Sequence, residues 1–429
     1  MVHWVKFKSG LDAGNSTSDP LERRQLSIYL DHSATTPICA EAIAAVHEVF
    51  QAQWGNPSST HRWGERSALA LELARGQVGA LVGTADPTEI VFTSGGTEAD
   101  NWALLGVARH YSEPRHLVIS SVEHSAIAKT ADFLETQGWD VTRLPVDRYG
   151  RVAPLDLSAA LRPDTALVSI IHGQSEVGTL QPIEELGAIA RNAGVLFHVD
   201  AVQTAGRVPL NLQTLPVDLL SLSSHKIYGP QGVGALYVRS GVKISPLLLG
   251  GAQEGQLRAG TQAVAAIAGF GAAAESIAQG IGSETQRLTG LRDRLFAGLG
   301  TGVGLQPTGD LTHRLPHHAS FCLDLKGWKN INTPPSGWDL VRQLNSASIA
   351  VSSGSACNSG TLSPSSVLVA MGYGETEAIG ALRFSLGQST QEADIDWTVQ
   401  VVQQILRRLG CSAIPQPPLV HRRSKTPIS

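Results

Sequence analysis

The chain has 429 residues, a length that predicts one large and one smaller domain rather than a single hydrophobic core. Its hydrophobic content of 42% and charged content of 16% are those of an ordinary folded protein. The formal net charge of −4 argues against a nucleic-acid or membrane-surface role, so we expect neither kind of partner.

The first 27 residues are polar and aperiodic, which predicts a flexible N-terminal extension. From about Glu89, short β-like runs rich in Val, Ile and Leu alternate with helix-like stretches. The runs are Ile90–Thr93, His116–Ser121, Val141–Val146, Ala166–Ile171, Val195–Asp200, Leu219–Ser224 and Ala235–Val238. Nearly continuous apolar runs are typical of strands buried on both faces. The pattern predicts an α/β domain, doubly wound around a mostly parallel seven-stranded sheet.

The rest of the chain predicts a smaller α+β domain, entered through an alanine-rich helix at Gln262–Gln279. Further helices are expected at Glu284–Leu299, Trp338–Ser346 and Ile395–Leu409. The stretch from Lys326 to Gly337 contains Pro and Trp and predicts a surface loop. We assign residues 1–27 to the extension, 28–40 to an N-terminal segment of the small domain, 41–275 to the large domain, 276–411 to the small domain and 412–429 to a flexible basic tail.

The four cysteines are Cys39, Cys322, Cys357 and Cys411. None has a CxxC spacing, so we expect neither a metal site nor a disulfide framework, and we predict a reducing, cytoplasmic location. No stretch is long and apolar enough to span a bilayer. Burial as a small hydrophobic side chain fits three of them. It fits Cys357 poorly, because the flanking Ser and Gly residues predict an accessible thiol that could act as a nucleophile or carrier.

The strongest chemical signal is Lys226, which follows an apolar run ending in Ser223-Ser-His225 and precedes a glycine-rich loop. A lysine at the end of a buried strand can form an imine, because desolvation lowers the pKa of its amine. The serine hydroxyls and His225 could hold an anionic group of a cofactor. The alternative for Lys226 alone is a solvated surface charge.

Other strand ends carry polar residues, and ligands of open α/β sheets bind outside the carboxyl ends of strands. Gly96 and Thr97 could form a phosphate cradle at a helix N-terminus or a simple capped turn. His124 could stack on a ring or cap a helix. Asp200 would need a cation, such as a protonated pyridine nitrogen, although a metal-binding HxD pattern is the rival. Gln203 could bond a phenolic oxygen or lie exposed.

Arg383 lies in a strand-like run, where a guanidinium can hold a carboxylate or form a structural ion pair. Lys226, the cradle, His124 and Asp200 together describe a pyridoxal phosphate pocket.

These motifs resemble the NifS/IscS-like cysteine desulfurases of the class V aminotransferase family, over roughly residues 28–409. The matching segments are Tyr29-Leu-Asp-His-Ser-Ala-Thr-Thr-Pro37, Asn56-Pro-Ser-Ser59 with His61, Thr93-Ser-Gly-Gly-Thr-Glu98, Glu123-His124, His198-Val-Asp-Ala-Val-Gln203, Ser224-His-Lys-Ile-Tyr-Gly-Pro230, Arg258-Ala-Gly-Thr261 and Ser352-Ser-Gly-Ser-Ala-Cys357. The resemblance implies the fold type I of pyridoxal-phosphate-dependent transferases, with pyridoxal 5'-phosphate as the cofactor.

The resemblance also implies a role for each matching residue. Lys226 carries the cofactor as an imine, Asp200 pairs with the pyridine nitrogen, Gln203 contacts the ring oxygen and His124 stacks on the ring and moves protons. The phosphate is held by Gly96, Thr97, Ser223 and His225. Thr261 reaches the phosphate of the neighbouring subunit, which implies a homodimer. The substrate contacts Arg383, Asn56 and Ser175, and Cys357 takes up the sulfur.

One departure from the family pattern is His172-Gly-Gln-Ser-Glu-Val-Gly178, where the family usually has Asn-Asn-Glu before a glycine. Ser175 stands where an asparagine normally contacts cofactor or substrate. Losing a hydrogen bond to a charged group costs ~1.5–3 kcal/mol, and a bridging water can recover part of it. We expect Ser175 to change affinity and rate rather than the reaction.

The resemblance implies removal of sulfur from L-cysteine, which gives L-alanine and a persulfide on Cys357. The sulfur would pass to an acceptor protein such as an iron–sulfur scaffold or to a thiolation pathway. The alternatives are a selenocysteine or cystine lyase or an aminotransferase of the same fold, none of which strictly needs a mobile thiol. A non-catalytic scaffold protein is a further rival, supported only by the change at Gln174 and Ser175.

Overall fold

The computed structural model describes residues 27–300, 304–328, 334–354 and 363–411, so Cys357 lies outside the described residues. All seven predicted strands form one sheet, in the order β2-β8-β7-β6-β5-β3-β4. The strands are β2 (Ile90–Thr93), β3 (His116–Ser120), β4 (Asp140–Leu144), β5 (Thr165–Ile171), β6 (Leu196–Asp200), β7 (Leu219–Ser223) and β8 (Gly234–Val238). Only β8 runs antiparallel to its neighbours in this sheet, which confirms the mostly parallel topology.

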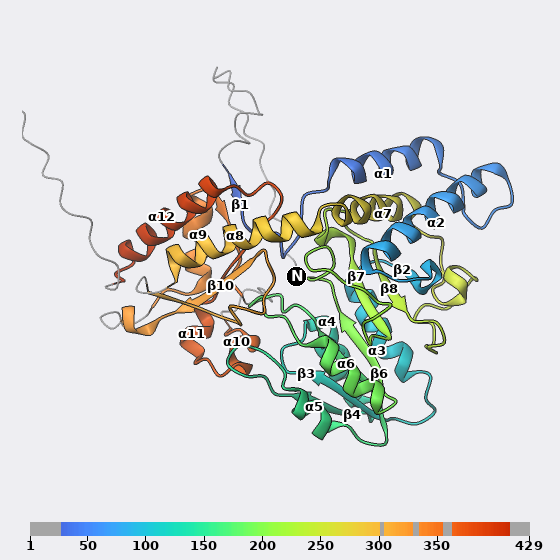
Figure 1. Cartoon of the computed structure of the whole chain (residues 1–429), viewed down its shortest axis with the longest axis horizontal. Coiled ribbons are helices and arrows are strands. Elements are labelled where there is room, and N and C mark those ends of the chain that lie inside the picture. The colour runs from blue at the N-terminus through green and yellow to red at the C-terminus, as the bar shows by residue number, and fades with distance from the viewer. Residues whose placement is uncertain (1–26, 301–303, 329–333, 355–362, 412–429) are drawn as a thin grey trace, which may run out of the picture.

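Helices cover both faces of this sheet, which explains why its central strands are apolar along their whole length (Figure 1). Two helices, α3 (Gly96–Ala108) and α4 (Ser125–Thr136), share a buried core with one face. The opposite face packs against α2 (Arg62–Val82), α5 (Pro154–Ala160), α6 (Ile183–Asn192) and α7 (Val264–Ala278). The helix α1 (Ala40–Ala52) packs on α7.

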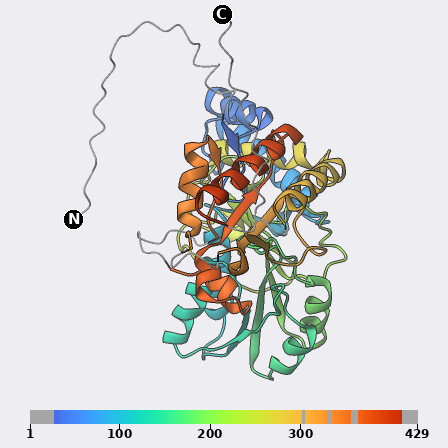
Figure 2. The ribbon, with the colours of Figure 1, turned by 90° about the vertical axis from the view of Figure 1, so that its left-hand side faces the viewer.

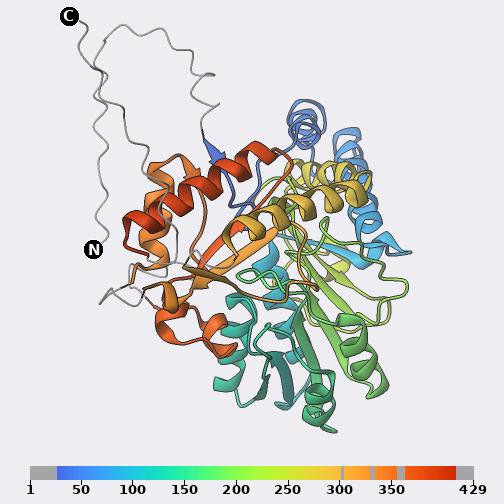
Figure 3. The ribbon, with the colours of Figure 1, turned by 60° about the vertical axis from the view of Figure 1, so that its left-hand side comes forward.

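A second core lies in the C-terminal part of the chain, around the sheet β12-β10-β9. Its strands are β9 (Leu305–Pro307), β10 (His318–Leu323) and β12 (Leu382–Ser385). Its helices are α8 (Ile281–Leu299), α9 (Gly337–Ser346), α10 (Ser366–Ala370), α11 (Glu375–Ile379) and α12 (Glu392–Arg408). Figure 3 shows the red helix α12 running beside the gold helix α8.

The N-terminal segment joins this second core through the pairing of β1 (Ile28–Tyr29) with β11 (Ile349–Ala350). This pairing places Ile28–Tyr29 with the smaller unit, whereas Cys39 packs against the core of the larger one. The chain leaves the larger unit through α7 and α8, which are bent by 75° relative to each other. Figure 2 shows the blue α1 and α2 helices at the upper end of the molecule.

The prediction of a surface loop from Lys326 to Gly337 is wrong for its first part. Residues Leu325–Trp328 form a 3-10 helix, and Trp328 is 2% exposed. Its indole nitrogen donates to the carbonyl oxygen of Gly304 at 2.9 Å, so the ring closes the second core.

Among the described helices, no single one is long and apolar enough to cross a membrane; only the bent pair α7 and α8 passes a test of length and composition.

Candidate active site

Lys226 lies just beyond the end of β7, in a 3-10 turn at Ser224–Lys226. Its Nζ donates to the carbonyl oxygens of Ser33 at 2.6 Å and Ala34 at 2.7 Å. Burial and the charge of Arg383 lower the pKa of Lys226 to about 8. The amine is therefore held in place with about a tenth of it neutral at pH 7, and the neutral amine is the form that attacks a carbonyl.

A hollow of 520 Å³ opens between the lysine turn and the start of α3. Its lining consists of small and polar residues, namely Ala34, Thr35, Ser94, Gly95, Gly96, Thr97, Glu98, Ser223, His225, Gln231, Gly232 and Val233. The unpaired N–H groups at the N-terminus of α3, a helix of 13 residues, favour an anion here. The predicted phosphate residues Gly96, Thr97, Ser223 and His225 all line this hollow.

Gly96 lies close to Val202, which follows β6, and this leaves little room for a side chain. A Cβ atom at this position would lie 2.7 Å from Cγ2 of Val202. His225 is held through its Nδ1, which lies 3.1 Å from Oγ1 of Thr35. Burial and the charge of Lys226 lower the pKa of His225 to about 4, so its ring is neutral and could hydrogen-bond an anion without adding charge.

Asp200 ends β6 and is 3% exposed. Its Oδ1 accepts a hydrogen bond from the backbone N–H of Val202 at 2.9 Å. Burial raises the pKa of Asp200, whereas the hydrogen bond from the backbone N–H of Val202 and the positive charge of Lys226 oppose that rise. A buried carboxyl group of this kind needs a cation or a donor nearby, as the sequence predicts for a protonated ring nitrogen.

His124 caps α4, because its Nδ1 accepts a hydrogen bond from the N–H of Ala126 at 3.2 Å. The capping interpretation is therefore confirmed, and it occupies only one ring nitrogen. Gln203 is 8% exposed, and the exposed-residue alternative is wrong for it. Its Nε2 donates to the carbonyl oxygen of Ser33 at 3.0 Å, the same oxygen that accepts from Lys226.

Arg383 in β12 is 8% exposed, and its guanidinium contacts Asp31 and Ser175. Its Nη2 donates to Oδ1 of Asp31 at 2.8 Å, and its Nη1 donates to the carbonyl oxygen of Ser175 at 2.9 Å. The structure thus shows the ion-pair alternative, in addition to a guanidinium placed near Lys226.

The departure at Gln174 and Ser175 has a structural consequence. Gln174 is 1% exposed, its Nε2 donates to the carbonyl oxygen of Val122 at 3.1 Å, and its Oε1 accepts from the N–H of Val177 at 3.0 Å. The amide of Gln174 therefore holds the turn. Ser175 contributes its backbone carbonyl, which accepts from Arg383 and from Nε2 of His318 at 3.1 Å.

Among the described residues, two predicted site residues are not gathered with Lys226. Asn56 is exposed in the loop between α1 and α2, where its Oδ1 accepts from the N–H of Ser58 at 3.0 Å. Thr261 is also exposed, and neither residue lines the hollow. Cys357 lies outside the described residues.

Two sets of site residues were missed by the sequence reasoning. Residues 31–36 supply the Asp31 carboxylate and the carbonyls that hold Lys226, and their only signal was the Tyr29–Pro37 motif. The second set consists of two buried acids, Asp100 and Glu123. Asp100 is 1% exposed, its Oδ1 lies 3.9 Å from Nε2 of His198, and that oxygen has no hydrogen-bond partner among the described residues.

The second missed acid is Glu123, which joins the ends of β3 and β5. Its Oε1 accepts from the hydroxyl of Ser120 at 2.5 Å and from the N–H of Ile171 at 3.0 Å. Burial raises the pKa of Glu123 to about 8. A run of strand-end residues Ser121–His124 was visible in the sequence, but nothing in it distinguished a buried carboxyl group from an exposed one.

The donor set fits pyridoxal 5'-phosphate. The amine of Lys226, with its lowered pKa, suits the aldehyde of that cofactor. The hollow at the N-terminus of α3 suits its phosphate, and the buried Asp200 suits its ring nitrogen.

Comparison with known proteins supports this assignment. Residues 28–397 match the class-V aminotransferase family. The chain is 42% identical over 396 residues to "Cysteine desulfurase IscS" of Methanosarcina thermophila, covering 92% of this chain and 96% of that protein. It is 43% identical over 384 residues to the protein of the same name from Dictyoglomus turgidum, covering 89% and 95%. A solved structure titled "NIFS-LIKE PROTEIN" has a TM-score of 0.81 and 35% identity, covering 89% of this chain and all of that one (100%).

The chain is therefore a member of the class-V aminotransferase family, whose enzymes depend on pyridoxal 5'-phosphate. Within that family, the relatives described above carry the name of cysteine desulfurases. The predicted family, fold type and cofactor are confirmed.

Proposed function

We propose that the protein is a cysteine desulfurase, which removes sulfur from L-cysteine, releases L-alanine and leaves a persulfide on Cys357. The relatives in the comparison carry this name, and the observation that carries the proposal in this chain is the position of Lys226. Its amine is fixed by two backbone carbonyls beside an anion hollow, a buried acid and a buried guanidinium.

The large unit would hold the cofactor. Lys226 would bind its aldehyde carbon, and its phosphate would be held in the hollow by Gly96, Thr97, Ser223 and His225. Asp200 would pair with the ring nitrogen, Gln203 would donate to the ring oxygen and His124 would stack on the ring. When bound, the cofactor withdraws electrons from the substrate Cα and so makes the Cα proton acidic.

Arg383 binds the α-carboxylate of the substrate, and the carbonyl of Ser175 keeps the guanidinium in place. As a free amine, Lys226 would be the base that removes the Cα proton, since its pKa of about 8 suits that role. The thiolate of Cys357 attacks the substrate sulfur, and the Cβ–S bond breaks with its electron pair left on the carbon chain. That chain is protonated and leaves as alanine.

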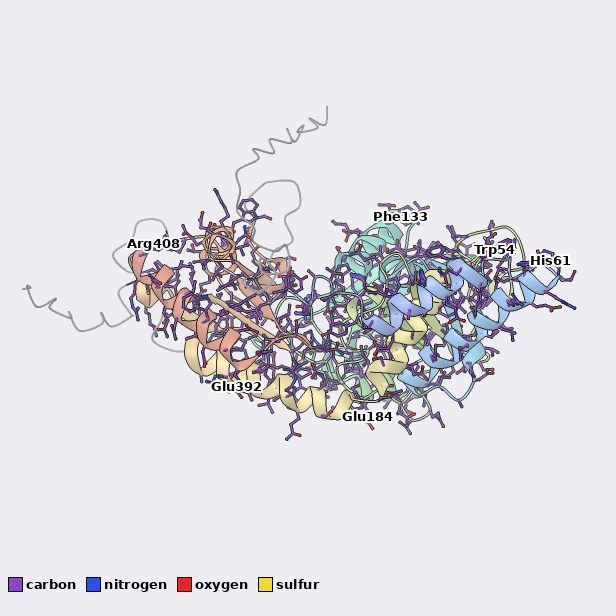
Figure 4. All side chains as sticks on the ribbon, turned by 90° about the horizontal axis from the view of Figure 1, so that it is seen from above. Trp54, His61, Phe133, Glu184, Glu392 and Arg408 are labelled. Carbon is purple, nitrogen blue, oxygen red and sulfur yellow. The ribbon has the colours of Figure 1, made fainter. Side chains whose placement is uncertain are left out.

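We further propose a homodimer, supported by an exposed apolar surface on α1 and α2. Six large hydrophobic side chains on these helices and the loop between them are at least half exposed, namely Ile43, Phe50, Trp54, Trp63, Leu69 and Leu73. Figure 4 labels Trp54 and His61 at the outer end of the molecule. An exposed surface of this kind marks a protein contact. In a dimer, the exposed Thr261 and Asn56 could serve the site of the partner subunit.

The physiological acceptor is proposed to be a sulfur-accepting protein such as an iron–sulfur scaffold, and the location cytoplasmic.

Formation of alanine tests the reaction against its rivals. We expect purified protein to convert L-cysteine to alanine and, with a reductant, to sulfide, and to need no keto acid. Cys357→Ser should retain the yellow cofactor and lose alanine formation from cysteine, while the matched control Cys39→Ser retains it. Full activity of Cys357→Ser would exclude the desulfurase assignment, and a requirement for a keto acid would favour an aminotransferase.

A further inference from the structure

We propose that Asp31 is an internal competitor of the substrate carboxylate at Arg383 and thereby sets how tightly the site binds carboxylates. This inference rests on the proposed role of Arg383 as the carboxylate-binding residue. Asp31 acts through Arg383 and is a positioning residue.

Asp31 is fixed by the backbone on both sides of it. It forms a parallel bridge with Ser385 in β12, beside Arg383. The hydroxyl of Tyr29 donates to the carbonyl oxygen of Asp31 at 3.1 Å and to that of Thr35 at 2.9 Å. The Asp31 carboxylate is therefore presented to Arg383 by a rigid turn.

The donors of Arg383 are only partly used. Nη2 is bonded to Asp31 and Nη1 to the carbonyl of Ser175, whereas Nε is buried without a hydrogen-bond partner among the described residues. A guanidinium has five N–H donors, so a second carboxylate can bind the remaining ones. That second carboxylate meets a cation whose charge is already balanced by Asp31, so its binding is weakened.

The pair also acts on Lys226. The positive charge of Arg383 lowers the pKa of Lys226, and the negative charges of Asp31 and Asp200 raise it. The Asp31 carboxylate, bonded to Arg383, offsets part of the effect of that arginine on the pKa of Lys226. Removal of the Asp31 charge takes away this offset, which strengthens anion binding at Arg383 and lowers the pKa of the lysine.

A simple carboxylate cannot gain binding energy from an amine or a thiol. With Asp31 present, such a carboxylate binds Arg383 poorly, whereas an amino acid also gains binding energy from its amine at the cofactor. Asp31 therefore lowers the affinity of Arg383 for every carboxylate, and an amino acid stays the tighter ligand only through the binding energy of its amine.

The test uses propionate, which has a carboxylate but neither amine nor thiol, and the cofactor-loaded enzyme. Asp31→Asn keeps an oxygen that can accept from Nη2 and removes the charge. We expect calorimetry to show propionate bound on the order of tenfold more tightly by Asp31→Asn than by the wild type. The KM for L-cysteine should fall more than kcat changes. Asp31→Ser provides a second charge-free variant if the amide distorts the turn.

The matched control is Asp164→Asn, an exposed carboxylate that pairs with Arg162 at 2.9 Å on the surface. It should leave propionate binding unchanged. Arg383→Gln should abolish propionate binding; if it does not, the proposed role of Arg383 is wrong. If Arg383→Gln abolishes binding but both Asp31 variants bind propionate no more tightly than the wild type, the inference about Asp31 is overturned while the role of Arg383 stands.

Discussion

The amine of Lys226 and the backbone carbonyl of Ser33 form a hydrogen bond of 2.6 Å across a sequence separation of 193 residues. The lysine belongs to the large unit, whereas the segment containing Ser33 follows β1, which pairs with β11 of the smaller unit. The reactive amine is thus positioned where the two units meet, within reach of Asp200 from one and Arg383 from the other.

The stability of the cofactor-free protein should depend on Lys226 above pH 8. The pKa of Lys226 is lowered from 10.5 to about 8, so between these values the unfolded chain binds more protons than the folded one. The free energy of unfolding therefore rises with pH across this window. This gain in stability is lost again as pH falls through 8. Denaturant titrations should show this rise in the wild type and a flatter curve in Lys226→Met. An equal rise in both proteins would show that the lysine is not depressed.

Asp100 should be a neutral acid in the folded protein. Burial and the charge of Asp200 raise its pKa well above 3.8, so its contribution to stability is present at low pH and is lost as pH rises through the raised value. Asp100→Asn mimics the neutral acid and should remove this loss while the cofactor stays bound. The infrared difference spectrum between the wild type and this variant should show the loss of one protonated-carboxyl band, while the band of Glu123, whose pKa is raised to about 8, remains.

The control for Asp100 is Asp200→Asn, which should release the cofactor because it removes the partner of the ring nitrogen. If Asp100→Asn weakened cofactor binding as much as Asp200→Asn, both acids would have to be ionised, contrary to this account.

Gly96→Ala should weaken the anion hollow. The added methyl group would lie 2.7 Å from Cγ2 of Val202 and 3.4 Å from Cβ of Ser223, so the start of α3 must shift. We expect a loss of stability of about 1–3 kcal/mol and a raised Kd for the cofactor, measured by equilibrium dialysis. Gly76→Ala in α2 is the matched control, because a Cβ there meets no atom within 4 Å. Unchanged cofactor affinity in Gly96→Ala would contradict the assignment of this turn.

Charge on the apolar surface of α1 and α2 should disrupt the dimer. Phe50 is 70% exposed and Leu69 is 71% exposed, so aspartate at both positions should leave the fold intact and prevent association. Sedimentation velocity should then show a monomer. Leu155→Asp is the control, because Leu155 is 81% exposed on α5, outside this surface. A double variant that sediments as the wild-type dimer would place the interface elsewhere.

The sheet and the residues at its strand ends could be predicted from the sequence because each depends on local pattern. Strands buried on both faces have continuous apolar sequences, which are visible as such. Parallel strands then bring Thr97, Asp200 and Lys226 to one edge of the sheet. The likeness of motifs gave Arg383 its role toward the substrate, because its short run of sequence does not reveal its partners.

The remaining features depend on contacts that no local pattern records. The carbonyls of Ser33 and Ala34 reach Lys226 only after the two units have packed. The buried state of Trp328 depends on Gly304, and that of Asp100 depends on the helix α3 covering a serine and histidine row in the sheet. Asn56 and Thr261 were predicted by motif, but one chain alone does not bring them to the hollow.

The measurement that tests the central claim most directly is the mass of the peptide containing Cys357 after one turnover with L-cysteine. The protein, loaded with cofactor, is mixed with substrate in the absence of reductant, alkylated and digested. This account predicts an added sulfur atom on Cys357, in an amount equal to the alanine released, and neither product in Lys226→Ala. Alanine formed without added sulfur on Cys357, or persulfide formed by Lys226→Ala, would contradict it.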